Sequence, residues 1–160
     1  MRPSSLVVLA VACSLISCNR PEIGIEEPTQ ALVGVWEVVD RSFERGDSTW
    51  TEVELGRYVF TNRYYAVQEI REAEGPRAVF TESTTDAERL GAFEVFHAHS
   101  GTYVVESDRL VVTPDLAKGP NTMSGASFAY GMALDGDELL VTRTSEAEDE
   151  RRVTRLRRVE

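Results

Sequence analysis

Cysteine is nearly absent from this 160-residue chain, and its two cysteines, Cys13 and Cys18, both lie within the first 18 residues. A framework of several disulfides, as found in small secreted domains, is therefore excluded. A chain of this length buries roughly 68–70% of its unfolded surface on folding, so a core can form without such cross-links. The length is that of a single domain.

Basic residues are also scarce. The chain has 17 lysines and arginines against 27 aspartates and glutamates, which gives a formal net charge of −10. Binding to nucleic acid requires clustered basic side chains, so nucleic acid is excluded as a partner. The same acidity argues against electrostatic docking on anionic lipid. Any attachment to a membrane must have another source.

Long hydrophobic runs are absent as well. The longest run, Leu6–Ile16, is too short to cross a bilayer core of about 30 Å as a helix, and it follows the positively charged Arg2. It ends in the tetrapeptide Leu-Ile-Ser-Cys at residues 15–18, which resembles the bacterial lipobox. We therefore predict a signal peptide over residues 1–17 and a lipid on the Cys18 thiol. The alternative is an ordinary secretory signal that contains a cysteine.

A lipid on Cys18 would make the membrane a partner of the chain. Each buried CH₂ of an acyl chain contributes about 0.8 kcal/mol, so several chains give lasting attachment. We predict a lipid-anchored protein of the bacterial cell envelope. Asn19 favours the outer membrane, facing the periplasm, if the source is Gram-negative. Residues 18–29 are polar and predict a lipidated flexible tether, with a first strand at 23–25 as the alternative.

The remaining residues, 30–160, contain short runs of β-forming residues separated by turn residues. Residues 86–96 differ, because their helical spacing and a possible cap at Thr85 or Asp86 predict one short helix. Residues 114–125 and 146–150 are expected to be loops. Strands are expected at 31–40, 49–55, 57–61, 64–72, 101–106, 109–113, 126–134, 138–144 and 153–159.

This pattern predicts a mainly β domain of about eight antiparallel strands. Successive hairpins must close into a barrel or pack as a sandwich to remove exposed edges. In the first strand, alternation places Trp36 and Val38 on one face and Glu37 and Arg41 on the other. An eight-stranded barrel has an interior that side chains fill or that holds one small ligand.

Three segments resemble the bacterial lipocalin-like domain proteins. Residues 32–37 are similar to the Gly-x-Trp signature of the first strand, and residues 92–103 to the segment that leads into a Gly-Thr-Tyr strand. Residues 134–139 are similar to an Asp-Gly-Asp hairpin that precedes a basic closing strand. The resemblance implies an antiparallel lipocalin-like barrel, often with an apolar cavity, and it names no ligand.

In such barrels the tryptophan covers the closed end, and an arginine of the last strand stacks on it. Trp36 is the corresponding residue here, and Arg155, Arg157 and Arg158 are the candidates for its partner. We select Arg157. The other basic pair, Arg151-Arg152, is expected to form ion pairs with acidic residues of the same chain.

Aromatic residues alternate along several of the expected strands, and tyrosine provides both apolar surface and a polar group. They predict a barrel that binds or carries a small apolar ligand. The alternative is a structural or protein-interaction lipoprotein with a solid core. The candidate ligand-binding residues are Tyr58, Phe60, Tyr65, Tyr103, Phe128 and Tyr130.

The two histidines, His97 and His99, are the strongest candidates for chemistry. On a strand they share a face, as zinc ligands would, but no third ligand lies at a recurring spacing. No Gly-x-Ser-x-Gly motif and no phosphate-binding loop are present. We therefore predict no metal and no cofactor. An enzyme that uses His97 or His99 remains a third hypothesis.

Overall fold

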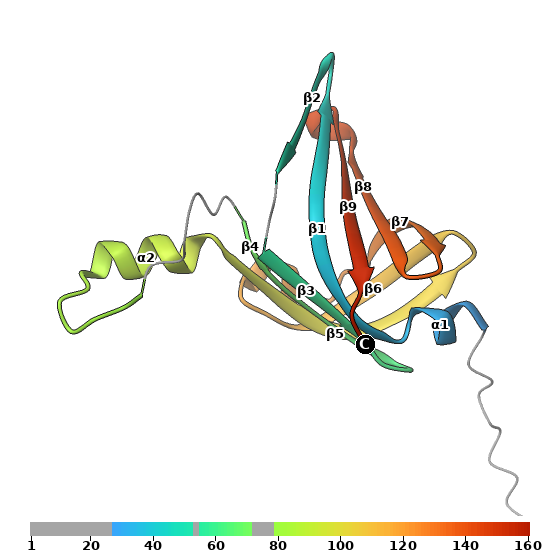
Figure 1. Cartoon of the computed structure of the whole chain (residues 1–160), viewed down its shortest axis with the longest axis horizontal. Coiled ribbons are helices and arrows are strands. Elements are labelled where there is room, and N and C mark those ends of the chain that lie inside the picture. The colour runs from blue at the N-terminus through green and yellow to red at the C-terminus, as the bar shows by residue number, and fades with distance from the viewer. Residues whose placement is uncertain (1–26, 53–54, 72–78) are drawn as a thin grey trace, which may run out of the picture.

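The computed structural model describes residues 27–52, 55–71 and 79–160. The predicted signal peptide, Cys18 and most of the predicted tether lie outside these residues. Within the described residues the chain forms nine strands and two α-helices (Figure 1). No helix in this part of the chain combines the length and the apolar character needed to cross a membrane.

The helices are α1 (Glu27–Leu32) and α2 (Asp86–Glu94), and short 3₁₀ turns cover Pro120–Met123 and Glu146–Glu148. The strands are β1 (Gly34–Arg45), β2 (Ser48–Glu52), β3 (Leu55–Phe60), β4 (Tyr64–Ile70), β5 (Phe96–Glu106), β6 (Arg109–Ala117), β7 (Phe128–Asp135), β8 (Glu138–Ser145) and β9 (Glu150–Arg158).

The strands close into an antiparallel barrel. Neighbours follow the order β2-β1-β3-β4-β5-β6-β7-β8-β9, and β9 also pairs with β1. Eight strands therefore form the closed barrel, while β2 adds a hairpin to the far half of β1. Closure gives the strands of the barrel partners on both sides, which removes exposed edges. The predicted mainly β fold of about eight strands is confirmed.

Strand β1 contains a bulge that reverses its alternation. Its register against β9 shifts between Val38 and Asp40, so one extra residue is inserted there. Before the bulge Trp36 points inward. After it Arg41 and Phe43 point inward, and Arg41 is 2% exposed. The prediction that Arg41 lies on the face opposite Trp36 is wrong, because the bulge moves it to the inner face.

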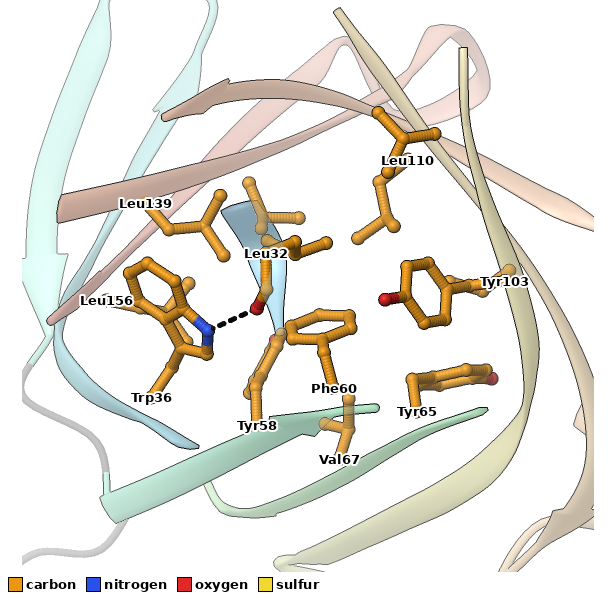
Figure 2. Close-up of a cluster of buried hydrophobic side chains, with 13 residues drawn as sticks. Leu32, Trp36, Tyr58, Phe60, Tyr65, Val67, Tyr103, Leu110, Leu139 and Leu156 are labelled. Atoms are coloured by element: carbon orange, nitrogen blue, oxygen red, sulfur yellow. Dashed lines mark hydrogen bonds between the residues drawn. The ribbon is translucent and has the colours of Figure 1, made fainter. Parts of the chain in front are cut away.

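Trp36 closes one end of the barrel and is fully buried. Its indole Nε1 donates a hydrogen bond of 2.9 Å to the carbonyl oxygen of Leu32 (Figure 2). The guanidinium of Arg158 lies 4.1 Å from the ring centre, and it donates hydrogen bonds to the carbonyl oxygens of Val33 and Ala31. The stacking arginine is therefore Arg158. Arg157 is exposed because it lies at the outward position of β9.

Several boundaries differ from those predicted. Residues 27–32 form α1, where a tether and the start of a strand were expected, because the closed end of the barrel buries Leu32. The predicted helix at 86–96 begins with a capping box at Thr85 and ends at Glu94, because β5 starts at Phe96. Strand β6 continues to Ala117, into the expected loop. Strand β9 begins at Glu150.

Replacing Trp36 by alanine is expected to cost roughly 3–5 kcal/mol of the free energy of unfolding, because it leaves a cavity at the closed end. Urea unfolding followed by circular dichroism measures the loss. The control is Trp50→Ala, because Trp50 is 37% exposed and its contacts, with Phe43, Arg45 and Glu52, lie within the β1–β2 hairpin. This control is expected to cost about 1 kcal/mol. Equal losses would contradict the structural role of Trp36.

Candidate functional site

Beyond the closed end the barrel contains a cavity of about 60 Å³. Its lining changes character along the barrel. Five apolar side chains from β3, β4, β6 and β8 form the apolar part of the lining, here called the apolar wall: Phe60, Val67, Leu110, Val112 and Val141. Charged side chains lie toward the end opposite Trp36: Arg41, Glu69, Arg71, Arg143 and Arg152. Tyr58, Tyr65, His99, Tyr130 and Thr154 complete the lining. The barrel is therefore not solidly packed.

Four of the six predicted ligand-binding residues line this cavity: Tyr58, Phe60, Tyr65 and Tyr130. Tyr103 does not, since it lies in the core, with its ring 5.2 Å from that of Phe60 and its hydroxyl donating to the Thr61 carbonyl oxygen at 2.6 Å. Phe128 is 36% exposed at the start of β7 and does not line the cavity. A ligand-binding role for the four remaining residues stays a prediction.

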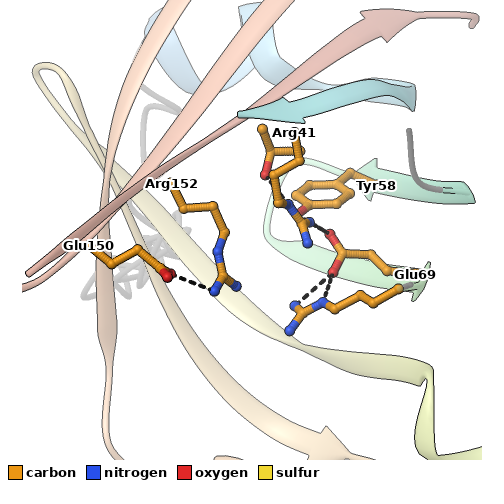
Figure 3. A network of polar contacts seen from close by, with 7 residues as sticks. Arg41, Tyr58, Glu69, Glu150 and Arg152 are labelled. Carbon is orange, nitrogen blue, oxygen red and sulfur yellow. Dashed lines mark hydrogen bonds and ion pairs between the residues drawn. The ribbon is translucent and has the colours of Figure 1, made fainter. Parts of the chain in front are cut away.

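A buried carboxylate, Glu69, holds together the polar side of the cavity (Figure 3). Its Oε1 accepts hydrogen bonds from Arg41 Nη2 and from the hydroxyl of Tyr58, the latter at 2.6 Å. Its Oε2 accepts two from Arg71, at 3.0 and 2.8 Å. Arg41 Nε also donates to Thr154 Oγ1 at 2.9 Å. The network joins β1, β3, β4 and β9.

Glu69 is 1% exposed, and its environment favours the ionised form. Burial alone would raise the pKa of its carboxyl, but the charges of Arg41 and Arg71 and the hydrogen bond from Tyr58 outweigh burial and lower it. Burial and the neighbouring carboxylate raise the pKa of Tyr58 well above its ordinary value. Glu69 is thus an anion and Tyr58 a neutral donor at neutral pH.

A second carboxylate, Glu150, lies on the same inner face. It accepts hydrogen bonds from Arg152 Nη2 at 2.8 Å and from Arg45 Nη2, and these lower the pKa of its carboxyl. Arg152 also packs its guanidinium 4.9 Å from the ring centre of Phe43. Across the β8–β9 ladder, Arg152 lies directly opposite Arg143. Two arginines thus face each other at the cavity.

His99 contacts the cavity from β5. Its Nδ1 lies 2.9 Å from the hydroxyl of Tyr65, and burial lowers the pKa of the imidazole below its ordinary value. His97 lies two residues earlier, and burial lowers its pKa too. Among the described residues no three His, Cys, Asp or Glu side chains gather as metal ligands. The described lining of the cavity contains no serine or cysteine that could act as a nucleophile beside His99. An enzyme that uses His97 or His99 stays a prediction.

The sequence analysis missed the charged half of the site. Glu69 and Arg71 continue the inward alternation of Tyr65 and Val67, so polar residues at period two in an apolar strand were an available signal. Arg143 follows Val141 in the same way on β8. Arg41 had no such signal, because its inward position depends on the bulge.

Removing the charge of Glu69 is expected to destabilise the barrel. In Glu69→Gln, Arg41 and Arg71 both lose the buried carboxylate that they share, and breaking a buried pair costs roughly 3–5 kcal/mol. Urea unfolding at neutral pH measures the change. The matched control is Glu37→Gln, since Glu37 pairs with Arg57 at 2.6 Å on the exposed surface. This control should change the free energy of unfolding by roughly 0–1 kcal/mol.

The same carboxylate predicts a pH dependence. Because the folded state lowers the pKa of Glu69, its contribution to stability is complete above the ordinary value of 4.5 and is lost as the pH falls through the lowered value. The stability difference between the wild type and Glu69→Gln should therefore shrink in acid. Urea unfolding at a series of pH values from neutral to below 4.5 checks this. A difference independent of pH would contradict the assignment.

No protein-family model matches this chain, and no curated protein matches it. Among solved structures, it is similar to the crystal structure of an uncharacterized protein from Bacteroides eggerthii DSM 20697. The two chains are 11% identical, with a TM-score of 0.44, and the alignment covers 79% of this chain and 98% of the other.

Proposed function

We propose that this chain is a lipid-anchored lipoprotein of the bacterial envelope whose lipocalin-like barrel binds or carries a small ligand. The observation that supports the proposal is the cavity inside the closed barrel, which is lined by apolar side chains and by hydrogen-bonding groups. Ligand sites commonly combine these two features. An interior selected only for stability would be expected to be filled by side chains.

The apolar wall provides the binding free energy. Phe60, Leu110 and Val112 are each no more than 3% exposed, so they are held in place by the surrounding core. Apolar ligand surface that they cover contributes about 25 cal/mol per Å². With a volume of about 60 Å³, the cavity is smaller than a typical ligand pocket of roughly 300 Å³ or more, so it accepts the end of a ligand. The proposed ligand is apolar over the part that enters the barrel.

The lipid anchor is the second part of the proposal, and it rests on the lipobox-like residues 15–18. Helix α1 lies at the closed end of the barrel, next to Trp36. A tether that reaches the barrel through α1 attaches at this end. The charged end of the cavity is then directed away from the membrane.

The anchor predicts different outcomes for the two cysteines. Cys18→Ser removes the acceptor thiol, so the protein should shift from the membrane fraction to the soluble fraction and lose the mass of the lipid. Cell fractionation and intact-mass spectrometry measure both effects. Cys13→Ser lies in the predicted signal peptide and should change neither. A Cys18→Ser protein that stays lipidated or membrane-bound would contradict the proposal.

Filling the cavity should abolish binding. Val112 lines the cavity at 3% exposure, whereas Val104 on the neighbouring strand is 53% exposed, so Val112→Phe and Val104→Phe form a matched pair. Overpacking costs roughly 1–3 kcal/mol, so folding of both variants is checked by circular dichroism. The probes are straight-chain 1-alcohols and carboxylates of four to ten carbons, measured by calorimetry and native mass spectrometry.

The wild type and Val104→Phe are expected to bind members of these series, and Val112→Phe is expected to bind none. If the wild type binds no member, or if a folded Val112→Phe binds as the wild type does, the cavity is not the site.

A further inference from the structure

The inner face of the barrel beyond the closed end carries an excess of positive charge. Among the described residues that line the cavity or belong to ion-pair networks with its lining, five are arginines and two are glutamates, an excess of three positive charges, although the whole chain has a net charge of −10. The arginines are Arg41, Arg45, Arg71, Arg143 and Arg152, and the glutamates are Glu69 and Glu150. This group of described residues and the chain as a whole thus have opposite net charge.

Three arginines of the outer surface each pair with a carboxylate of their own. Arg57 pairs with Glu37, Arg151 with Glu44 and Arg155 with Asp40. Inside the barrel, each glutamate is instead shared by two arginines. The chain has ten more acidic than basic residues, so a shortage of carboxylates does not explain the excess inside.

The excess is concentrated at Arg143 and Arg152. They are direct cross-strand neighbours on β8 and β9, and both line the cavity. Like charges in this position repel each other and destabilise the sheet. Within the described residues Arg143 forms no ion pair, and the buried Nε of Arg152 has no hydrogen-bond partner. An anion between the two guanidinium groups would relieve the repulsion and accept these hydrogen bonds.

We propose that the ligand of this cavity is an aliphatic monocarboxylate whose carboxylate binds between Arg143 and Arg152; this rests on the proposed ligand-binding function. A planar guanidinium donates two parallel hydrogen bonds to a carboxylate, a geometry that a neutral hydroxyl cannot match. Val141 lies two residues before Arg143 on the same face of β8 and belongs to the apolar wall. An alkyl chain attached to the bound carboxylate therefore continues along that wall.

Carboxylates and 1-alcohols of the same chain length, from four to ten carbons, test this proposal by calorimetry at low salt. Charge-assisted hydrogen bonds are roughly twice as strong as neutral ones, so the best carboxylate should bind about tenfold tighter than its alcohol. The preference should fall at high salt because ions screen the partly exposed guanidinium groups.

Arg143→Gln is the decisive variant, since Arg143 is exposed at one side and its loss should not prevent folding. It should bring the affinity for the carboxylate close to that for the alcohol. Arg143→Gln should also raise the thermal midpoint of the ligand-free protein, because the substitution removes the repulsion with Arg152. If Arg143 were purely structural, the substitution would lower that midpoint. The control, Arg151→Gln, removes the same charge from the outward-facing residue next to Arg152 and should keep the preference.

The outcomes separate the two proposals. If alcohols bind as tightly as carboxylates, the cavity binds ligands and the carboxylate assignment is overturned. A preference that persists in Arg143→Gln, or that is lost equally in Arg151→Gln, also overturns it. If neither series binds the wild type, the proposed function and this inference fail together.

Discussion

The hydrogen-bonded ladder between β1 and β9 joins the first strand of the barrel to the last. It is a long pairing that runs from Trp36 opposite Arg158 to Arg45 opposite Glu150. Without it the strands would form an open sheet with two free edges and no enclosed interior. The core, the cavity and the charged residues all depend on this closure, because each is built from side chains that point inward only in a closed barrel.

The bulge in β1 divides this ladder into two parts with different chemistry. On one side of it the inner face carries Trp36 and an apolar core, and on the other side it carries Arg41 and Phe43. A regular strand would have exposed Arg41 to water and left Glu69 with one guanidinium fewer. The inserted residue therefore allows a buried ion pair to form beside an apolar wall.

Period-two alternation was sufficient to predict most of the strands, and it correctly indicated Trp36, Tyr58, Phe60 and Tyr65 as inward-facing residues. It failed where local geometry departs from regular pleating, as at Arg41. Phe128 shares the alternation of Tyr130 but is the first residue of β7 and is 36% exposed. The choice of Arg157 as the residue that stacks on Trp36 was wrong. Which arginine of β9 lies beside Trp36 depends on the register between β1 and β9, and a single sequence does not reveal that register. Glu69, Arg71 and Arg143 were missed although they continue the inward alternation of their strands, because charged side chains ordinarily lie on the outer surface.

The last described residue, Glu160, lies against the start of β1. The backbone N–H of Val35 donates to the carbonyl oxygen of Glu160 at 2.8 Å, and Gly34 has no room for a side chain because a Cβ there would lie 2.4 Å from that oxygen. A fusion partner appended after Glu160 would therefore emerge beside α1 and crowd the base of the barrel.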